Sequence, residues 1–170
     1  CLGDSESYED LVRQSLKPNV GLKAFFRAGA PTTLKRRFVD PSYMRKLFEV
    51  YFMNDEPLTP DLQGEVDGAI ADAASGYDVV IAADFGHGLI NRSSIDVLTA
   101  KSRFLAVNTQ SNSANLGYNL ITKYRRADYV CIDAPEARLA VSDRTSNVGD
   151  IARRLAEEHI DCSRIIITQG

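Results

Sequence analysis

Hydrophobic residues in the last two thirds of the chain alternate between two spacings, which predicts alternating helices and strands. Apolar residues three and four positions apart predict helices over 62–74, 93–100, 118–124, 135–141 and 148–159. Short apolar runs predict buried strands over 78–83, 104–107, 129–132 and 164–168. Strands and helices of these lengths in strict alternation indicate an α/β fold, with a parallel sheet flanked by helices.

The first third of the chain has a different pattern. Apolar positions at helical spacing predict a helix over 8–16, which Pro18 ends. Three strand-like runs follow, over 21–27, 32–39 and 45–53. A turn signal at 40–42 separates the last two runs, so this part is expected to be antiparallel. Both faces of the third run carry apolar side chains, and we expect both faces to pack.

These patterns divide the chain into three parts. We expect a partial α/β segment over 1–20, the strands of a small antiparallel β-sheet lid over 21–54, and an α/β nucleotide-binding core over 55–170. A polar stretch with two prolines follows residue 53 and is typical of a linker. The chain starts at Cys1 with neither an initiator Met nor a signal-peptide pattern, so we expect it to be cut from a longer protein.

Composition and charge narrow the function. The chain has 170 residues and is 44% hydrophobic, which is enough for a buried core. A net charge of −3 and a pI near 5.4 argue against a general nucleic-acid binder, which needs a basic surface. No run is long and apolar enough to span a membrane. The three cysteines, Cys1, Cys131 and Cys162, lack metal-binding spacing, and a reduced cytoplasmic setting is the simplest interpretation.

Polar and small residues follow each predicted strand of the core, and they are candidate ligand contacts. In doubly wound sheets, ligands bind beyond the carboxyl ends of the strands. Carboxylates and amides at these ends suit a magnesium–phosphate ligand whose metal keeps several waters. The four strand ends are Asp84-Phe85-Gly86-His87-Gly88, Asn108-Thr109-Gln110, Asp133-Ala134-Pro135-Glu136 and Thr168-Gln169-Gly170.

Several of these candidates also have a structural interpretation. Asp84 can cap the turn that follows it through its own side chain. Asp133 can cap the helix over 135–141, with Glu136 at the positive end of that helix. In the first third, Lys35 and Arg37 share one face of a strand. That face either meets a sugar or phosphate under a lid or is simply solvated.

Four motifs in this order resemble those of the PfkB (ribokinase-like) carbohydrate kinases, closest to the heptose-kinase domains of ADP-heptose biosynthesis. The family's patterns are T-x-K-x-R, D-Y-x-K-G, N-x-x-E and T-x-G. The corresponding segments are Thr33–Arg37, Asp84–Gly88, Asp133–Glu136 and Thr168–Gly170. The resemblance runs from about Leu2 to Gly170 and covers only the middle of the family's domain.

The resemblance implies a ribokinase-like domain that transfers the γ-phosphate of ATP to a hydroxyl of a sugar or sugar phosphate, in the biosynthesis of a nucleotide-activated heptose or related sugar. It implies substrate contacts at Lys35, Arg37, Asp84 and His87. It implies nucleotide contacts at Asn108, Gln110, Asp133, Glu136, Thr168 and Gly170. Mg²⁺ is then held indirectly, through ATP and waters, with Glu136 as the residue that organises it.

The resemblance also carries expectations about catalysis and assembly. The family's catalytic aspartate belongs to a later Gly-Ala-Gly-Asp motif, which is expected beyond Gly170. We therefore expect the 170-residue chain to hold no catalytic residue and to be inactive by itself. Lid sheets of the family often pair with a second subunit, so a homodimer through the β lid is expected.

Three departures from the family patterns leave other functions open. His87 stands where the family commonly has Lys, Asp133 stands for Asn, and Asn108-Thr109-Gln110 stands for Asp-Pro-Lys. These substitutions suggest a divergent branch with an altered substrate or weakened catalysis, and the segment 108–119, rich in Asn, Ser and Gln, is expected to form a polar loop specific to that branch. The alternative function is a non-catalytic kinase-fold module that binds a sugar or nucleotide or serves assembly. A third hypothesis is an unrelated α/β nucleotide-binding domain.

Overall fold

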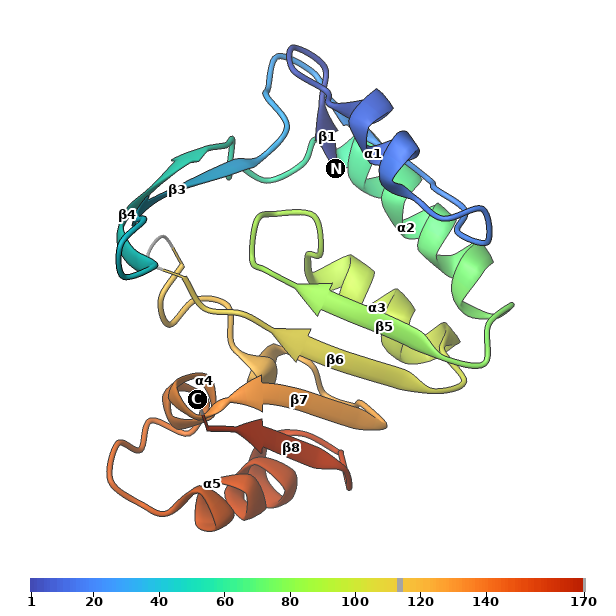
Figure 1. Cartoon of the computed structure of the whole chain (residues 1–170). Coiled ribbons are helices and arrows are strands. Elements are labelled where there is room, and N and C mark those ends of the chain that lie inside the picture. The colour runs from blue at the N-terminus through green and yellow to red at the C-terminus, as the bar shows by residue number, and fades with distance from the viewer. Residues whose placement is uncertain (113–114, 170) are drawn as a thin grey trace. The chain divides into compact units, whose positions relative to one another are not determined.

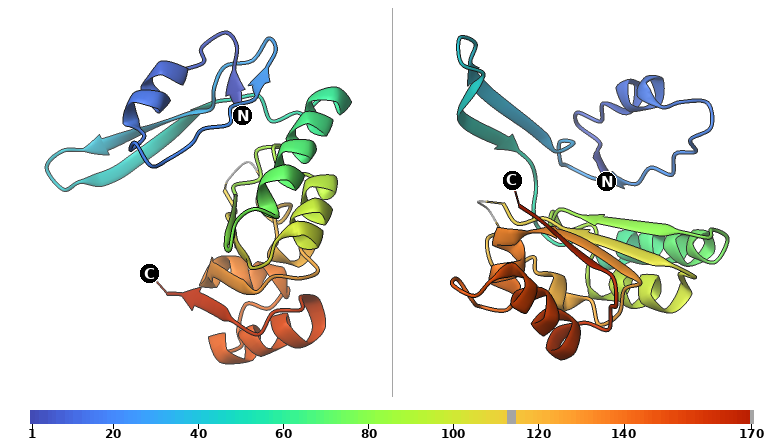
Figure 2. Two further views of the ribbon diagram at one scale, coloured as in Figure 1. Left: turned by 90° about the vertical axis from the view of Figure 1, so that its right-hand side faces the viewer. Right: turned by 60° about the horizontal axis from the view of Figure 1, so that its bottom comes forward.

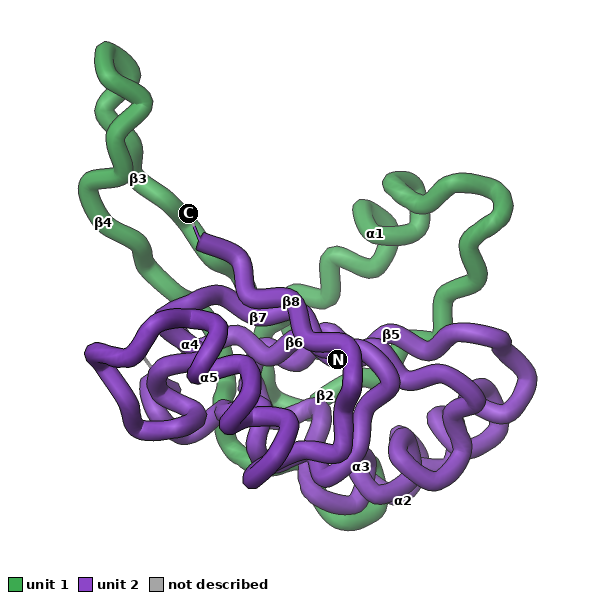
Figure 3. The backbone as a smooth tube through the Cα atoms, turned by 90° about the horizontal axis from the view of Figure 1, so that it is seen from below, with its two compact units in different colours: residues 1–62 green, residues 63–170 purple. Residues whose placement is uncertain are grey.

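A computed structural model describes residues 1–112 and 115–169, and the chain falls into two compact units, Cys1–Leu62 and Gln63–Gly170 (Figure 3). Helix α2 (Pro60–Ala74) begins just before the boundary between them and extends into the second unit. None of the helices in the described ranges is long and apolar enough to cross a membrane.

The second unit is built on a four-stranded parallel sheet with its strands in chain order (Figure 1). The strands are β5 (Val80–Asp84), β6 (Leu105–Thr109), β7 (Tyr129–Asp133) and β8 (Ile165–Thr168). The connecting helices are α3 (Arg92–Lys101), the 3-10 helix η1 (Ile121–Lys123), α4 (Ala134–Ala140) and α5 (Val148–Arg154). This arrangement confirms the α/β fold expected from the alternation of helical and strand spacings.

The core of the second unit lies between one face of this sheet and the helices that pack on it (Figure 2). Leu105 is 0% exposed, and Ile132 is buried in the same cluster. The neighbouring strand positions point the other way, and Ile81 is 73% exposed. The period of two therefore gives the sheet one buried and one open face.

A polar cluster fixes the start of α3 against α2. Asn91 is the N-cap of α3, and its side-chain oxygen accepts a hydrogen bond of 3.1 Å from the Ser94 backbone N–H. The buried Ser94 hydroxyl donates to Asp67 over 2.6 Å and accepts from the Gln63 amide over 2.8 Å. These bonds satisfy polar groups that burial would otherwise leave unpaired, and they anchor the chain that leaves β5.

The first unit holds a helix and two small two-stranded sheets. Helix α1 (Glu9–Ser15) occurs where the helical spacing predicts it. The strands β1 (Leu2–Gly3) and β2 (Phe26–Arg27) pair in parallel. The strands β3 (Leu34–Asp40) and β4 (Arg45–Phe52) form an antiparallel hairpin, with an irregularity between Phe38 and Val39. The antiparallel sheet expected near the N-terminus is thus confirmed.

The hairpin β3–β4 has two faces of different chemistry. Lys35 lies opposite Tyr51 on one face, and Arg37 lies opposite Glu49 on the same face. The other face carries Leu34, Phe38, Phe48, Val50 and Phe52. The expectation that both faces pack is wrong for the described chain, because Phe48 is 53% exposed. Its ring stacks on Phe38 at a centroid distance of 4.4 Å.

Three predicted elements differ from the structure. The run 21–27 forms only the short β2, which pairs in parallel with β1. The helix expected over 118–124 shrinks to η1, since Asn119 directs its side chain to backbone carbonyls elsewhere. The helix over 148–159 changes at Leu155 into one π-helical turn, Leu155–His159.

Candidate functional site

The strand ends predicted to bind a ligand lie along one edge of the β5–β8 sheet. Asp84 and Thr109 are register partners at the ends of β5 and β6. Asp133 and Thr168 are register partners at the ends of β7 and β8. Parallel strands place their carboxyl ends at the same edge, so the structure brings the four predicted segments to one side of the sheet. Gly170 lies outside the described residues.

Asp84 is buried at the end of β5, with 2% of its surface exposed, and both of its carboxylate oxygens have partners. Oδ1 accepts a hydrogen bond of 3.0 Å from the Gly86 N–H, which is the turn cap considered from the sequence. Oδ2 accepts from the Tyr124 hydroxyl over 2.8 Å and lies 2.6 Å from Lys123 Nζ. Burial, and then the charge of Asp84, raise the pKa of Tyr124 well above its usual range.

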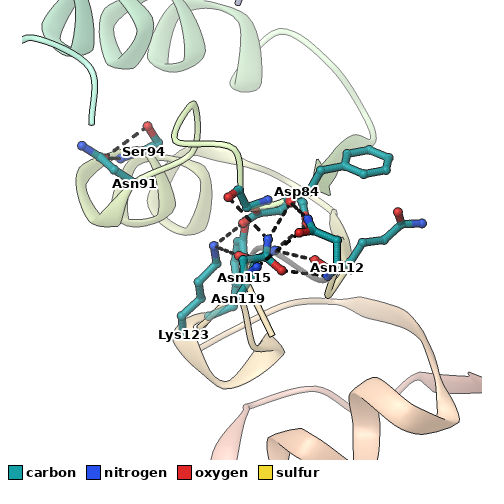
Figure 4. Close-up of polar contacts among 11 residues, drawn as sticks. Asp84, Asn91, Ser94, Asn112, Asn115, Asn119 and Lys123 are labelled. Atoms are coloured by element: carbon teal, nitrogen blue, oxygen red, sulfur yellow. Dashed lines mark hydrogen bonds and ion pairs between the residues drawn. The ribbon is translucent and has the colours of Figure 1, made fainter. Parts of the chain in front are cut away.

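The amide-rich segment after β6 bonds to the turn after β5 (Figure 4). Asn119 Nδ2 donates to the carbonyls of Asp84, over 2.8 Å, and Gln110, over 3.0 Å. Asn115 Nδ2 donates to the Phe85 carbonyl over 2.9 Å. The Gln110 N–H adds a backbone bond of 2.9 Å to the Asp84 carbonyl. The turn after β5 and the amide-rich segment after β6 are thus joined by hydrogen bonds. We call the described residues of 84–88 and 110–119 together the amide wall.

Gly86 is required where the two parts of the amide wall meet. Its φ of +69° lies in the left-handed region, which side chains rarely adopt. A Cβ at this position would stand 2.2 Å from Asn115 Nδ2 and 2.8 Å from Asn119 Cβ. The next residue, His87, is half-buried on the same turn. The close approach of the amide side chains therefore depends on a residue without a Cβ.

The end of β7 is joined to the start of α4 by reciprocal hydrogen bonds. Asp133 Oδ1 accepts from the Glu136 N–H over 2.8 Å, and Glu136 Oε2 accepts from the Asp133 N–H over 3.1 Å. Glu136 Oε1 accepts from the Ser111 N–H over 2.8 Å. Burial, the largest effect, raises the pKa of Glu136 against these backbone hydrogen bonds. The capping role considered for Asp133 is confirmed.

The remaining candidates at the strand ends differ in whether their side chains take part in hydrogen bonds within the sheet or are exposed. Asn108 Nδ2 donates to the Cys131 carbonyl over 2.7 Å, which ties β6 to β7. The Gln110 and Thr168 side chains are on exposed residues at the edge. In the ranges 1–112 and 115–169, no group of three or more His, Cys, Asp or Glu side chains is arranged to hold a metal ion. Gln110 and Thr168 are therefore accessible to a ligand, as is Asp133 at the end of β7.

Lys35 and Arg37 lie in the other unit, on the polar face of the hairpin. Their Nζ and Nε atoms are 2.9 Å and 3.1 Å from the carboxylate of Glu49, which Lys46 also reaches at 2.8 Å. Hydrogen bonds from Lys46 and Lys35 lower the pKa of Glu49 to about 2. Lys35 Nζ also lies 5.0 Å from the centre of the Tyr51 ring. Three cations around one carboxylate leave this face with a positive charge.

Sequence reasoning missed four residues that bind the predicted ones at the sheet edge and on the hairpin: Glu49, Asn119, Lys123 and Tyr124. The abundance of amides in 108–119 is a signal for an unusual segment, although it does not show which carbonyls the amides bind. The Lys123–Tyr124 pair carries no motif, and it contacts Asp84 from about forty positions away. Glu49 is identified only by the register of the hairpin.

Comparison with known proteins yields matches among solved structures. No model of a protein family matches the chain, and no curated protein matches its sequence. The structure of Sa239 matches with a TM-score of 0.70 and 16% identity, over 99% of this chain and 54% of that one. The tetrameric inhibited form of phosphofructokinase-2 from Escherichia coli matches with a TM-score of 0.67 and 12% identity, over 99% and 55%. Ribokinase from Giardia lamblia matches with a TM-score of 0.65 and 14% identity, over 99% and 52%.

These matches show that the chain has a ribokinase-like fold, the fold of PfkB and ribokinase-family sugar kinases. The hypothesis of an unrelated α/β nucleotide-binding domain is therefore wrong at the level of the fold. The chain spans about half the length of the solved structures it matches.

Proposed function

We propose that this chain is part of a carbohydrate kinase, which transfers the γ-phosphate of ATP to a hydroxyl of a sugar or sugar phosphate. The observation that carries the proposal is the edge at which β5 to β8 end, where polar side chains gather on a ribokinase-like fold. Phosphoryl transfer depends mainly on positioning and electrostatic stabilisation, which such an edge can supply.

ATP binds along this edge in our proposal, with Gln110 and Thr168 as direct contacts. The strand end of β7 fits Mg²⁺ only through waters, because both oxygens of Glu136 already accept backbone N–H bonds. Asp133 is exposed, and it would orient metal-bound water on the phosphate side. Bound Mg²⁺ would neutralise phosphate charge, and the residues of the chain would fix where the phosphates lie.

A calorimetric titration of the chain with Mg-ATP tests this part of the proposal. Thr168→Val keeps the β-branched shape but removes the hydroxyl, and it should weaken binding about fivefold to tenfold, the value of one hydrogen bond. Thr145→Val, in an exposed loop, is the matched control and should leave the affinity unchanged. Equal affinities for both variants would contradict the assigned role of Thr168.

A sugar phosphate is the substrate class that the hairpin favours. Lys35 and Arg37 share a positively charged face, and an aromatic ring lies beside them, which suits a phosphorylated sugar. We propose a heptose phosphate or a related sugar phosphate, in the biosynthesis of a nucleotide-activated sugar. Lys35→Met should weaken binding of fructose 6-phosphate, used as a probe, but not binding of Mg-ATP; equal loss of both would contradict a substrate role.

A homodimer through the hairpin follows from its apolar face. Phe38, Phe48 and Phe52 are 40%, 53% and 45% exposed, which is an unusual concentration of uncovered rings. We propose that the same rings of a second copy cover them, which would form the homodimer expected through the β lid. Sedimentation should show a dimer that Phe48→Glu converts to a monomer, and a monomeric wild-type chain would contradict this arrangement.

A non-catalytic module is the second candidate function. Asp84 and Glu136 are the buried carboxylates of the edge, and both are fully engaged in hydrogen bonds or an ion pair. Neither is a convincing general base, and we propose that the chain by itself transfers no phosphate. Turnover by the chain in a phosphorylation assay would contradict that proposal. Activity that stays at zero in the longer protein, even with His87→Lys and Asp133→Asn, would favour the binding module.

A further inference from the structure

We propose that Lys123 is a positioning residue of the nucleotide edge: by neutralising buried Asp84 and holding Asn119, it keeps the amide wall in the shape that receives the ligand. Lys123 belongs to η1, between β6 and β7, and none of the predicted site motifs contains it. The inference rests on the proposed function, since it assigns Lys123 a part in the site that binds ATP.

Lys123 supplies the positive charge that compensates the buried carboxylate of Asp84. A buried carboxylate is strongly disfavoured unless a cation and hydrogen bonds compensate it. Asp84 has a single cation within the described contacts, Lys123 at 2.6 Å, and two hydrogen-bond donors, the Gly86 N–H and the Tyr124 hydroxyl. Without Lys123, the buried carboxylate of Asp84 loses its compensating cation, which destabilises its present position and its bond to the Gly86 N–H.

Lys123 also fixes the amide that connects the two halves of the wall. Its Nζ donates to Asn119 Oδ1 over 2.5 Å, which orients the Asn119 side chain. The Asn119 Nδ2 atom then faces the carbonyls of Asp84 and Gln110, and it donates to both. One ammonium group therefore controls both ends of the contact between the turn after β5 and the segment after β6 (Figure 4).

The effect on a ligand is indirect. The amide wall continues the ends of β5 and β6, where Gln110 and the turn that carries His87 lie. Its hydrogen bonds hold these groups in place before a ligand arrives, so that binding does not have to order them. Displacing such groups by about an ångström is enough to weaken binding or catalysis by tenfold or more.

The test measures Mg-ATP binding by three variants whose folding is first checked by NMR. Lys123→Met should weaken binding about tenfold. The double variant Asp84→Asn with Lys123→Met removes both charges and leaves an amide that can accept from the Gly86 N–H, so it should bind more tightly than Lys123→Met. It should stay below wild type, because Asn119 still lacks its bond to Lys123. Lys101→Met, an exposed lysine at the end of α3, is the control and should bind like wild type.

Other outcomes overturn the inference. Unchanged binding by Lys123→Met would show that the wall needs no lysine. Equal weakening in the single and double variants would show that Lys123 does not act through Asp84, and it would overturn the inference. If Lys123→Met does not fold, the double variant decides: it folds and binds if Lys123 acts through Asp84, and failure to do so overturns the inference.

Amide hydrogen exchange separates this inference from the proposed function. The Gly86 and Gln110 N–H groups bond to the Asp84 side chain and backbone. They should exchange at least about tenfold faster in Lys123→Met and regain protection in the double variant. If wild type binds no Mg-ATP while exchange behaves in this way, the proposed function fails and the structural role of Lys123 stands. Unchanged exchange overturns the role of Lys123 whatever the ligand does.

Discussion

The hairpin of the first unit and the sheet of the second use the same alternation of side chains and obtain different stability from it. In the sheet, one face is covered by helices, and Leu105 and Ile132 are almost fully buried. In the hairpin, Leu47 is 62% exposed, and its strands are supported mainly by pairs across the two strands. An isolated two-stranded hairpin is marginally stable in water, whereas a sheet packed on helices has a core. We infer that the sheet sets the stability and that the hairpin can rearrange or bind without unfolding the rest.

The largest effect should come from a matched pair of leucine substitutions. Leu105→Ala removes a fully buried side chain from the core and should lower the free energy of unfolding by about 2–5 kcal/mol. Leu47→Ala removes an exposed side chain from the hairpin and should change it by less than about 0.5 kcal/mol. Urea denaturation followed by circular dichroism measures both. A similar loss in the two variants would mean that the hairpin is part of the same core.

A glycine pair gives a smaller effect inside the second unit. Gly86 and Gly117 both have positive φ, +69° and +82°, so alanine at either costs about 1–2 kcal/mol of backbone strain. Only at Gly86 would the new Cβ also meet the amide wall; at Gly117 it meets no described atom within 4 Å. Gly86→Ala should therefore destabilise the chain more than Gly117→Ala in the same urea experiment. Equal losses would show that the side chains of the amide wall move aside for the new Cβ without a measurable change in the free energy of unfolding.

The fold was largely predictable from the sequence, for a physical reason. Burial on one face imposes a period of two on strands and of about 3.6 on helices, so β5 to β8 and α2 to α4 could be located from spacing. The errors occur where another interaction outweighs the pattern. Asn119 bonds to distant carbonyls instead of extending a helix. β2 pairs with β1, a two-residue strand that no hydrophobic pattern predicts.

The candidate site was less predictable, because its contacts join distant parts of the chain. The strand ends could be named from the sequence, and the structure places them at one edge. What their side chains do could not be inferred, since Asp84 meets Lys123 and Tyr124 only after β5 and β6 pair. Spacing arguments reach neighbours three or four residues away, whereas ion pairs across a fold depend on tertiary packing.

A double-mutant cycle measures what the hairpin's own pairs contribute. Phe38 and Phe48 stack at 4.4 Å, and a cycle with alanine at each position should give a coupling of about 0.5–1 kcal/mol for the hairpin's local stability. The measurement is hydrogen exchange of the β3–β4 amides, because the free energy of global unfolding reflects the stability of the sheet and not that of the hairpin. A coupling near zero would mean that the rings stack only by proximity.

The smallest expected change in overall stability comes from acid titration of Glu49. Its pKa is lowered from 4.5 to about 2, so its ion pairs stabilise the hairpin above pH 4.5, and this contribution is lost as the pH falls toward 2. Chemical shifts of the Lys35 and Lys46 side chains should follow that titration, while the core signals of Leu105 and Ile132 stay unchanged until the whole chain unfolds. Glu49→Gln should remove the transition and leave the core signals as they are in wild type. If instead the core titrates together with Glu49, then the hairpin and the sheet are energetically coupled, and the hairpin does not rearrange independently.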